Sequence, residues 1–183
     1  LAASERMYLG LDGRVVNNSN HIGMLAIGVP GTVAGLYKAH QELGSLPWED
    51  LVAPAVALAR DGISITYSLQ TGFAQSANRF RQYPSSAEKF FRADGSFYEL
   101  DDIWVQPDLA HTLELIQNNG RDGFYKGPNA KKLSDFMAAN GGLITEEDLE
   151  IYEAVEREPI RSTYRGYEIV SMPPPSSGGV VLT

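Results

Sequence analysis

The chain has 183 residues, of which 43% are apolar and 21% are charged, and its formal net charge is −8. This balance is typical of a folded globular protein, and the length allows one domain with a sizeable core. The negative charge, without clusters of lysine and arginine, argues against nucleic-acid binding, and the lack of cysteine excludes disulfides, thiolate metal sites and a cysteine nucleophile.

Membrane and metal sites are also disfavoured by the sequence. No stretch approaches the roughly 18 consecutive apolar residues of a membrane-spanning helix, and no signal peptide is visible. The chain starts at Leu1 instead of methionine, which suggests that a longer N-terminus has been removed. The three histidines, His21, His40 and His111, are too scattered for a ligand pair, so we expect no metal site.

The N-terminal part is predicted to hold a surface segment, a strand and a helix. Residues 1–20 end in an Asp-Gly turn and a polar run, which favours a mobile surface segment. The apolar run from Met24 to Val29 predicts a buried strand. Thr32 is expected to cap a helix from Val33 to Leu43, closed by Gly44. The glycines in this stretch match neither the dinucleotide-binding fingerprint nor the Walker loop, which argues against a nucleotide-phosphate site.

Two further helices follow. Pro47 is expected to open a helix that runs to Arg60, with Pro54 kinking or restarting it. Its expected inward residues are Leu51, Val52, Ala55, Val56, Leu58 and Ala59. Helical spacing also predicts a helix from Tyr67 to Phe80, with Leu69, Phe73, Ala74, Ala77 and Phe80 facing inward. We interpret its aromatic residues as core rather than as a cofactor stack.

The middle of the chain is also predicted to be mostly helical. A short helix should run from Pro84 to about Phe91, and Asp94-Gly95 indicates a turn between two extended segments. Two longer helices are expected, from Asp108 to Asn118 and from Asn129 to Ala139, forming an antiparallel pair. Their expected inward residues are Leu109, Leu113, Leu115, Ile116, Leu133, Phe136 and Met137.

A capping box and two extended segments are predicted after these helices. Thr145 to Asp148 fits a capping box better than it fits paired catalytic carboxylates or a cation site. Residues 154–157 and 166–172 read as extended segments, and Pro173 to Pro175 must end any strand pairing because proline donates no hydrogen bond.

Five stretches of the chain stand out when they are read in order. They are Gly28 to Gly35, Pro54 to Gly62, Phe124 to Gly127, Asn140 to Leu149, and Met172 to Gly179. Together, over nearly the whole chain, this set resembles the gamma-glutamyltransferase (gamma-glutamyltranspeptidase) family of N-terminal-nucleophile hydrolases. Five matches in the family's order are far more specific than any one of them.

The resemblance implies a helix-rich α+β fold, part of a four-layer αββα sandwich without the catalytic small subunit. Residues 1–183 would form a single partial domain of the large subunit. The nucleophile implied by the resemblance is the N-terminal threonine of the small subunit, whose own amine acts as base. Thr183 lacks a free amine, and Arg6 lacks the Arg-Glu motif of the family's carboxylate-binding arginine. We therefore expect no catalytic residue in this chain.

The candidate substrate-binding residues lie in the last matching stretch. By resemblance, Ser176, Ser177, Gly178 and Gly179 would form a turn next to the substrate pocket. The alternative is that they merely connect a strand to a helix. If the chain is cut out of a larger domain, apolar residues near its end should be exposed, including Val180, Val181 and Leu182.

The function implied by the resemblance is transfer or hydrolysis of the gamma-glutamyl group of glutathione and related amides through an acyl-enzyme. The implied partners are gamma-glutamyl small molecules and the small subunit of the same precursor, with no cofactor. The implied location is the bacterial periplasm or the outside of the cell. Two alternatives stay open: a sister acylase acting on cephalosporin-type amides, and a non-catalytic scaffold or binding module.

Overall fold

The computed structural model describes residues 2–182, with the side chain of Leu182 outside the described part. The chain divides into two compact units, Leu1–Tyr152 and Glu153–Thr183. The first unit is mostly helical, and the second contains a hairpin and one short helix. The fold is therefore helix-rich α+β, as predicted.

The first unit contains eight α-helices, one 3-10 helix and a two-stranded ribbon among its described residues. The helices are η1 (Met24–Ala26), α1 (Thr32–Leu43), α2 (Trp48–Asp61), α3 (Tyr67–Phe80), α4 (Pro84–Phe90), α5 (Pro107–Asn119), α6 (Asp122–Tyr125), α7 (Gly127–Ala139) and α8 (Glu146–Glu150). Strands β1 (Ile63–Ser64) and β2 (Ile103–Trp104) pair antiparallel. The N-terminal segment before η1 is a series of turns with one bridge, between Leu9 and Val15.

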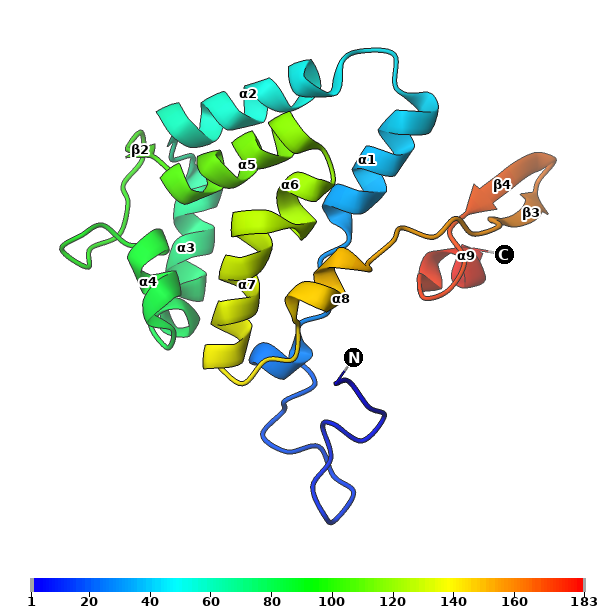
Figure 1. Cartoon of the computed structure of the whole chain (residues 1–183), viewed down its shortest axis with the longest axis horizontal. Coiled ribbons are helices and arrows are strands. Elements are labelled where there is room, and N and C mark those ends of the chain that lie inside the picture. The colour runs from blue at the N-terminus through cyan, green and yellow to red at the C-terminus, as the bar shows by residue number, and fades with distance from the viewer. Residues whose placement is uncertain (1, 183) are drawn as a thin grey trace. The chain divides into compact units, whose positions relative to one another are not determined.

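Helices α2 and α5 lie side by side and make the most extensive helix contact of this unit (Figure 1). Val56 and Ala59 of α2 and Ala110 and Ile116 of α5 are buried. The indole Nε1 of Trp48 donates a hydrogen bond to the carbonyl oxygen of Ile116 at 2.9 Å, which links the start of α2 to the C-terminal part of α5. Burial of these apolar side chains is the main force that holds the pair together.

An aromatic cluster fills the space between α3, α4 and β2. Phe73 is buried at its centre, and its ring meets that of Trp104 edge-on at 5.0 Å between centroids. Phe80 and Phe90 stack at 4.2 Å, so these rings fill space against one another. The prediction that the aromatic residues of this helix belong to the core is confirmed for Phe73 and Phe80, whereas Tyr67 is 73% exposed.

The second unit is built on the hairpin of β3 (Ile160–Tyr164) and β4 (Tyr167–Ser171), followed by α9 (Ser177–Leu182). The two turn residues, Arg165 and Gly166, have φ of 50° and 86°, the left-handed backbone of a tight hairpin turn. Helix α9 packs against β4. Val180 and Val181 are 60% and 79% exposed, as predicted, while the side chain of Leu182 lies outside the described residues.

Most helix boundaries match the sequence prediction, but the strand predicted from Met24 to Val29 is wrong. Its first residues form η1, in which the Ala26 N–H donates to Gly23 O at 3.2 Å. Among the described residues, no strand runs beside this segment, so its backbone groups bond locally. Thr32 is also not a cap, because α1 begins at Thr32 itself after Gly31.

Other differences concern pairing and exposure. Helix α5 pairs with α2 rather than with α7, because the short α6 lies between α5 and α7 in the chain and contacts both. Residues 154–157 form no strand, and the hairpin begins after Pro159. The Asp94-Gly95 turn is present, but no strand flanks it directly. Helix α2 continues through Pro54.

Several residues that were expected to face inward are instead exposed to solvent: Leu51, Ala55, Leu58, Ala74, Leu109 and Phe136.

Candidate functional site

The four predicted site residues follow the Pro173 to Pro175 run and lead into α9. The Ser176 N–H donates to Pro173 O at 3.2 Å, which closes a turn after β4. Arg157 steadies the same run, because its Nη1 donates to the carbonyl oxygen of Pro174 at 2.8 Å. Ser177 is exposed at the first position of α9. Of the four residues predicted to form a turn, only Ser176 lies in the connection after β4, and Ser177, Gly178 and Gly179 form the first turn of α9.

Gly179 is the tightly packed member of this turn. It is buried, and a Cβ placed on it would collide with the backbone carbonyl oxygen of Met172 and touch Ile160. Glycine is required there because α9 approaches the end of β4 too closely for any side chain. Gly178 differs, since a Cβ there would meet only the Ser176 hydroxyl, at 3.6 Å.

The chemistry available on this turn is limited to hydrogen bonding. The side chains of residues 173–179 are prolines, serines and glycines, so they offer two hydroxyls and no titratable group. A serine nucleophile needs an adjacent general base to activate it. The turn can therefore orient a ligand, but it carries no acid, base or activated nucleophile of its own.

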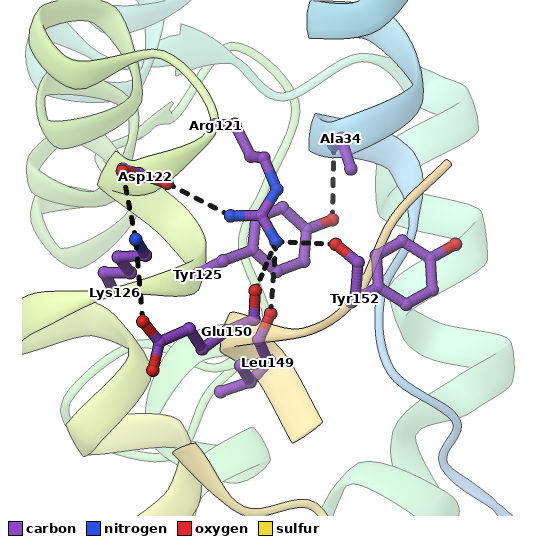
Figure 2. A network of polar contacts seen from close by, with 8 residues as sticks. All are labelled: Ala34, Arg121, Asp122, Tyr125, Lys126, Leu149, Glu150 and Tyr152. Carbon is purple, nitrogen blue, oxygen red and sulfur yellow. Dashed lines mark hydrogen bonds and ion pairs between the residues drawn. The ribbon is translucent and has the colours of Figure 1, made fainter. Parts of the chain in front are cut away.

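A second polar cluster, in the first unit, was not recognised in the sequence (Figure 2). Arg121 precedes α6, and its Nη2 donates to the carbonyl oxygens of Glu150 at 2.8 Å and of Tyr152 at 2.5 Å. Its Nη1 also bonds the Asp122 carboxylate at 3.0 Å. The guanidinium therefore satisfies carbonyl groups at the C-terminal end of α8, where a positive charge is favoured.

Tyr125 connects this cluster to the start of α1. Its hydroxyl donates to Pro30 O at 2.5 Å and accepts from the Ala34 N–H at 3.2 Å. The ring is fully buried and stacks on that of Tyr152 at 5.7 Å, and burial raises the pKa of its hydroxyl. The Arg121 guanidinium lies 4.8 Å from the centre of the Tyr125 ring.

The Arg121 cluster joins α1, α6 and α8 and has the properties of a structural junction. Lys126 adds ion pairs to Asp122 at 3.5 Å and to Glu150 at 3.6 Å. The hydrogen-bonding groups of Arg121, Tyr125 and Lys126 are directed at other parts of the chain (Figure 2). The only sequence signal was indirect: Tyr125 lies in the stretch from Phe124 to Gly127, but nothing there identifies its partners.

Comparisons with known proteins agree with the motif pattern. A sequence model of the family described as gamma-glutamyltranspeptidase matches residues 1–183. The glutathione hydrolase proenzyme of Pseudomonas sp. (strain A14) is 42% identical over 182 residues, which are 100% of this chain and 32% of that protein. The acylase ACY 1 proenzyme of Pseudomonas sp. (strain SE83) is 39% identical over 167 residues, which are 91% of this chain and 30% of that protein.

The fold agrees with the sequence matches. The crystal structure of Helicobacter pylori gamma-glutamyltranspeptidase superimposes with a TM-score of 0.95 at 41% identity, covering 100% of this chain and 52% of that chain. The chain thus spans about a third of the length of the curated relatives described above. Because the family match covers every residue, the chain belongs to the gamma-glutamyltranspeptidase family of N-terminal-nucleophile hydrolases.

Proposed function

We propose that the chain is part of the large subunit of an enzyme that transfers or hydrolyses the gamma-glutamyl group of glutathione and related amides. The observation that carries this proposal is the family match over residues 1–183, together with 42% identity to a glutathione hydrolase proenzyme. The contribution of residues 1–183, which belong to one partial domain of that subunit, is structural.

The catalytic partner in this proposal is the small subunit released from the same precursor. The word proenzyme in the names of the relatives supports a precursor that is processed. The nucleophile is then the new N-terminal threonine, whose own amine takes the proton as the acyl-enzyme forms. The side chains of residues 173–179 offer no substitute for this group.

The proposed role of Ser176, Ser177, Gly178 and Gly179 is to line the rim of the gamma-glutamyl pocket. Support comes from the exposed Ser177, the hydroxyls of the turn and the anchoring of the turn by Gly179. Replacing both serines with alanine in the complete enzyme is expected to raise KM for gamma-glutamyl substrates. Unchanged kinetics in this double variant would remove the turn from the pocket.

An acylase function is the second candidate. It is favoured by the 39% identity to an acylase proenzyme, because the same scaffold then serves another amide substrate. Assaying the full-length protein in parallel on gamma-glutamyl-p-nitroanilide and on a cephalosporin-type amide separates the two. A non-catalytic scaffold or binding module predicts turnover of neither substrate.

The proposed location of the complete protein is the bacterial periplasm or the medium. No helix within residues 2–182 is long and apolar enough to cross a bilayer. The location rests on the family resemblance and is tested by cell fractionation followed by immunoblotting. Recovery in the cytosolic fraction contradicts it.

The central experiment is a chimera in which this chain replaces the corresponding segment of a similar enzyme. Residues 1–183 replace the matching segment of the Helicobacter pylori gamma-glutamyltranspeptidase, to which they are similar over their whole length. We expect the chimera to cleave itself and to release p-nitroaniline from gamma-glutamyl-p-nitroanilide, while the chain alone releases none. A chimera that folds but is neither processed nor active contradicts the proposal, as does activity of the chain alone.

A further inference from the structure

The sequence contains two Asn-Gly pairs, Asn119-Gly120 and Asn140-Gly141. In such a pair, the backbone nitrogen of glycine can attack the Asn side-chain amide, because glycine has no side chain to hinder the approach. Both pairs stand at the C-terminal end of a helix, α5 and α7 respectively. They therefore allow a direct comparison within one molecule.

The two asparagine side chains are held in the same way. The Nδ2 of Asn119 donates to Leu115 O at 3.0 Å, and the Nδ2 of Asn140 donates to Phe136 O at 2.8 Å. Each bond reaches back one helical turn, to the carbonyl oxygen of the residue four positions earlier, and Phe136 O also accepts from the Asn140 N–H at 3.1 Å. The hydrogen bond made by the Asn side chain is therefore the same at both sites and does not distinguish them.

The glycines that follow differ in their surroundings. Gly120 is buried, and the position of a Cβ on it is occupied by the ring of Tyr37. Gly141 is exposed with φ of 77°, and nothing lies within 4 Å of the same position. Beyond Gly141, the Gly142 N–H donates to Met137 O at 2.7 Å. The peptide after Asn140 can turn when the last helical turn frays, and the peptide after Asn119 cannot.

We propose that Asn140 is a site of spontaneous deamidation and that packing protects Asn119. The Gly141 backbone nitrogen loses its proton and forms a bond to Cγ of Asn140, and the Cγ–Nδ2 bond breaks with release of ammonia. Water then opens the resulting cyclic imide at either carbonyl, which leaves aspartate or isoaspartate at position 140. Water is the only co-reactant, and no electrons are transferred.

The product alters the end of α7. A carboxylate replaces an N–H donor beside Phe136 O, and it stands at the negative end of the helix dipole. Isoaspartate also lengthens the backbone where Gly141 and Gly142 end the helix. Asn140 borders an open groove of about 710 Å³, together with Ile22, Arg79 and Phe136, so the new charge also appears at the edge of this groove.

The test follows both sites in the same sample. The folded 183-residue chain is kept in mildly alkaline buffer at physiological temperature, and peptides carrying each pair are quantified by mass spectrometry over time. A second sample is kept in concentrated urea. We expect Asn140 to convert at least about ten times faster than Asn119 in the folded chain, and the two rates to become similar in urea.

Two variants complete the experiment. Asn140→Gln removes the reaction because the longer side chain cannot close the same ring, and Asn140→Asp reproduces the charged product. We expect Asn140→Asp to elute with the aged native protein on anion exchange and to melt at a lower temperature than Asn140→Gln. Equal rates at the two sites in the folded chain, or faster conversion of Asn119, would overturn the proposal.

Discussion

At the scale of single residues, Arg121 shows how one guanidinium can hold several segments together. Its side chain is only 22% exposed, and its nitrogens bond carbonyl oxygens at the end of α8 as well as a carboxylate. Lysine carries a compact ammonium that cannot reproduce this forked pattern. We expect Arg121→Lys to lower the free energy of unfolding by about 1.5–3 kcal/mol, the value of hydrogen bonds to a charged group.

Urea denaturation followed by circular dichroism measures this loss. The matched control is Arg60→Lys in the same unit, whose ion pair with Asp61 is mostly solvent-exposed, with side-chain exposures of 58% and 67%. Exposed pairs of this kind contribute little to stability. Equal midpoints for the two variants would show that the Arg121 contacts do not stabilise the fold.

Gly178 and Gly179 provide a second residue-scale comparison. Gly179→Ala places a methyl group against Met172 O, so we expect it to displace α9 from β4 at a cost of about 1–3 kcal/mol. Gly178→Ala meets only the Ser176 hydroxyl, at an ordinary contact distance of 3.6 Å, and improves helix propensity. Amide NMR spectra of β3 and β4 are the readout, and we expect large shifts for Gly179→Ala alone. Similar spectra for both variants would contradict the close packing.

At the scale of elements, α8 depends on its capping box. The Thr145 hydroxyl accepts from the Asp148 N–H at 3.1 Å, and the Asp148 carboxylate accepts from the Thr145 N–H at 3.0 Å. We expect Thr145→Ala to cost about 0.5–2 kcal/mol and Thr145→Ser to cost much less, because serine keeps the hydroxyl. Thermal unfolding of the two variants checks this order.

The same box predicts a pH dependence. Hydrogen bonds from the backbone N–H and the hydroxyl of Thr145 lower the pKa of Asp148 below its ordinary value. The stability they contribute is thus present above the ordinary Asp pKa of about 4 and is lost as pH falls through the lower folded-state value. We expect Asp148→Asn to flatten the stability profile in this acid range, and an unchanged slope would contradict the assignment.

The elements also show which parts of the fold could be read from the sequence. Helices α3 and α5 were predicted to within about one residue, because caps, glycine stops and apolar spacing are local signals. The strand expected at Met24 to Val29 failed because a strand needs a neighbouring strand, which a local apolar run does not encode. The prediction of which helices pair was wrong for the same reason. Helical spacing shows that α5 has an apolar face, but it does not show that α2 covers that face.

Of the two candidate sites, one could be predicted from local sequence signals and the other could not. The connection from β4 into α9 could be predicted because prolines and glycines mark such connections locally. The Arg121 cluster was not visible, since its partners are carbonyl oxygens about thirty positions further along, at Glu150 and Tyr152. Backbone acceptors carry no residue identity, so spacing cannot predict them.

At the scale of the whole molecule, the second unit is too small to be stable by itself. Residues 153–183 form a two-stranded hairpin and one short helix, and domains below roughly 40 residues usually need disulfides, metals or a partner. The sequence has no cysteine to supply a disulfide. In the chain alone, we therefore expect β3 and β4 amides to exchange with solvent far faster than those of α2 and α5.

Hydrogen exchange followed by mass spectrometry tests this expectation, and the processed chimera with the Helicobacter pylori enzyme extends it. If the hairpin belongs to a larger domain, its unpaired strand edges should gain partners there, and the amides of Ile160–Tyr164 and Tyr167–Ser171 should become protected. The buried α2 and α5 amides serve as the internal reference, because their protection should change little. Strong protection of the hairpin in the chain alone would mean that the second unit is an independent fold, and rapid exchange in an active chimera would exclude the hairpin from the enzyme's sheet.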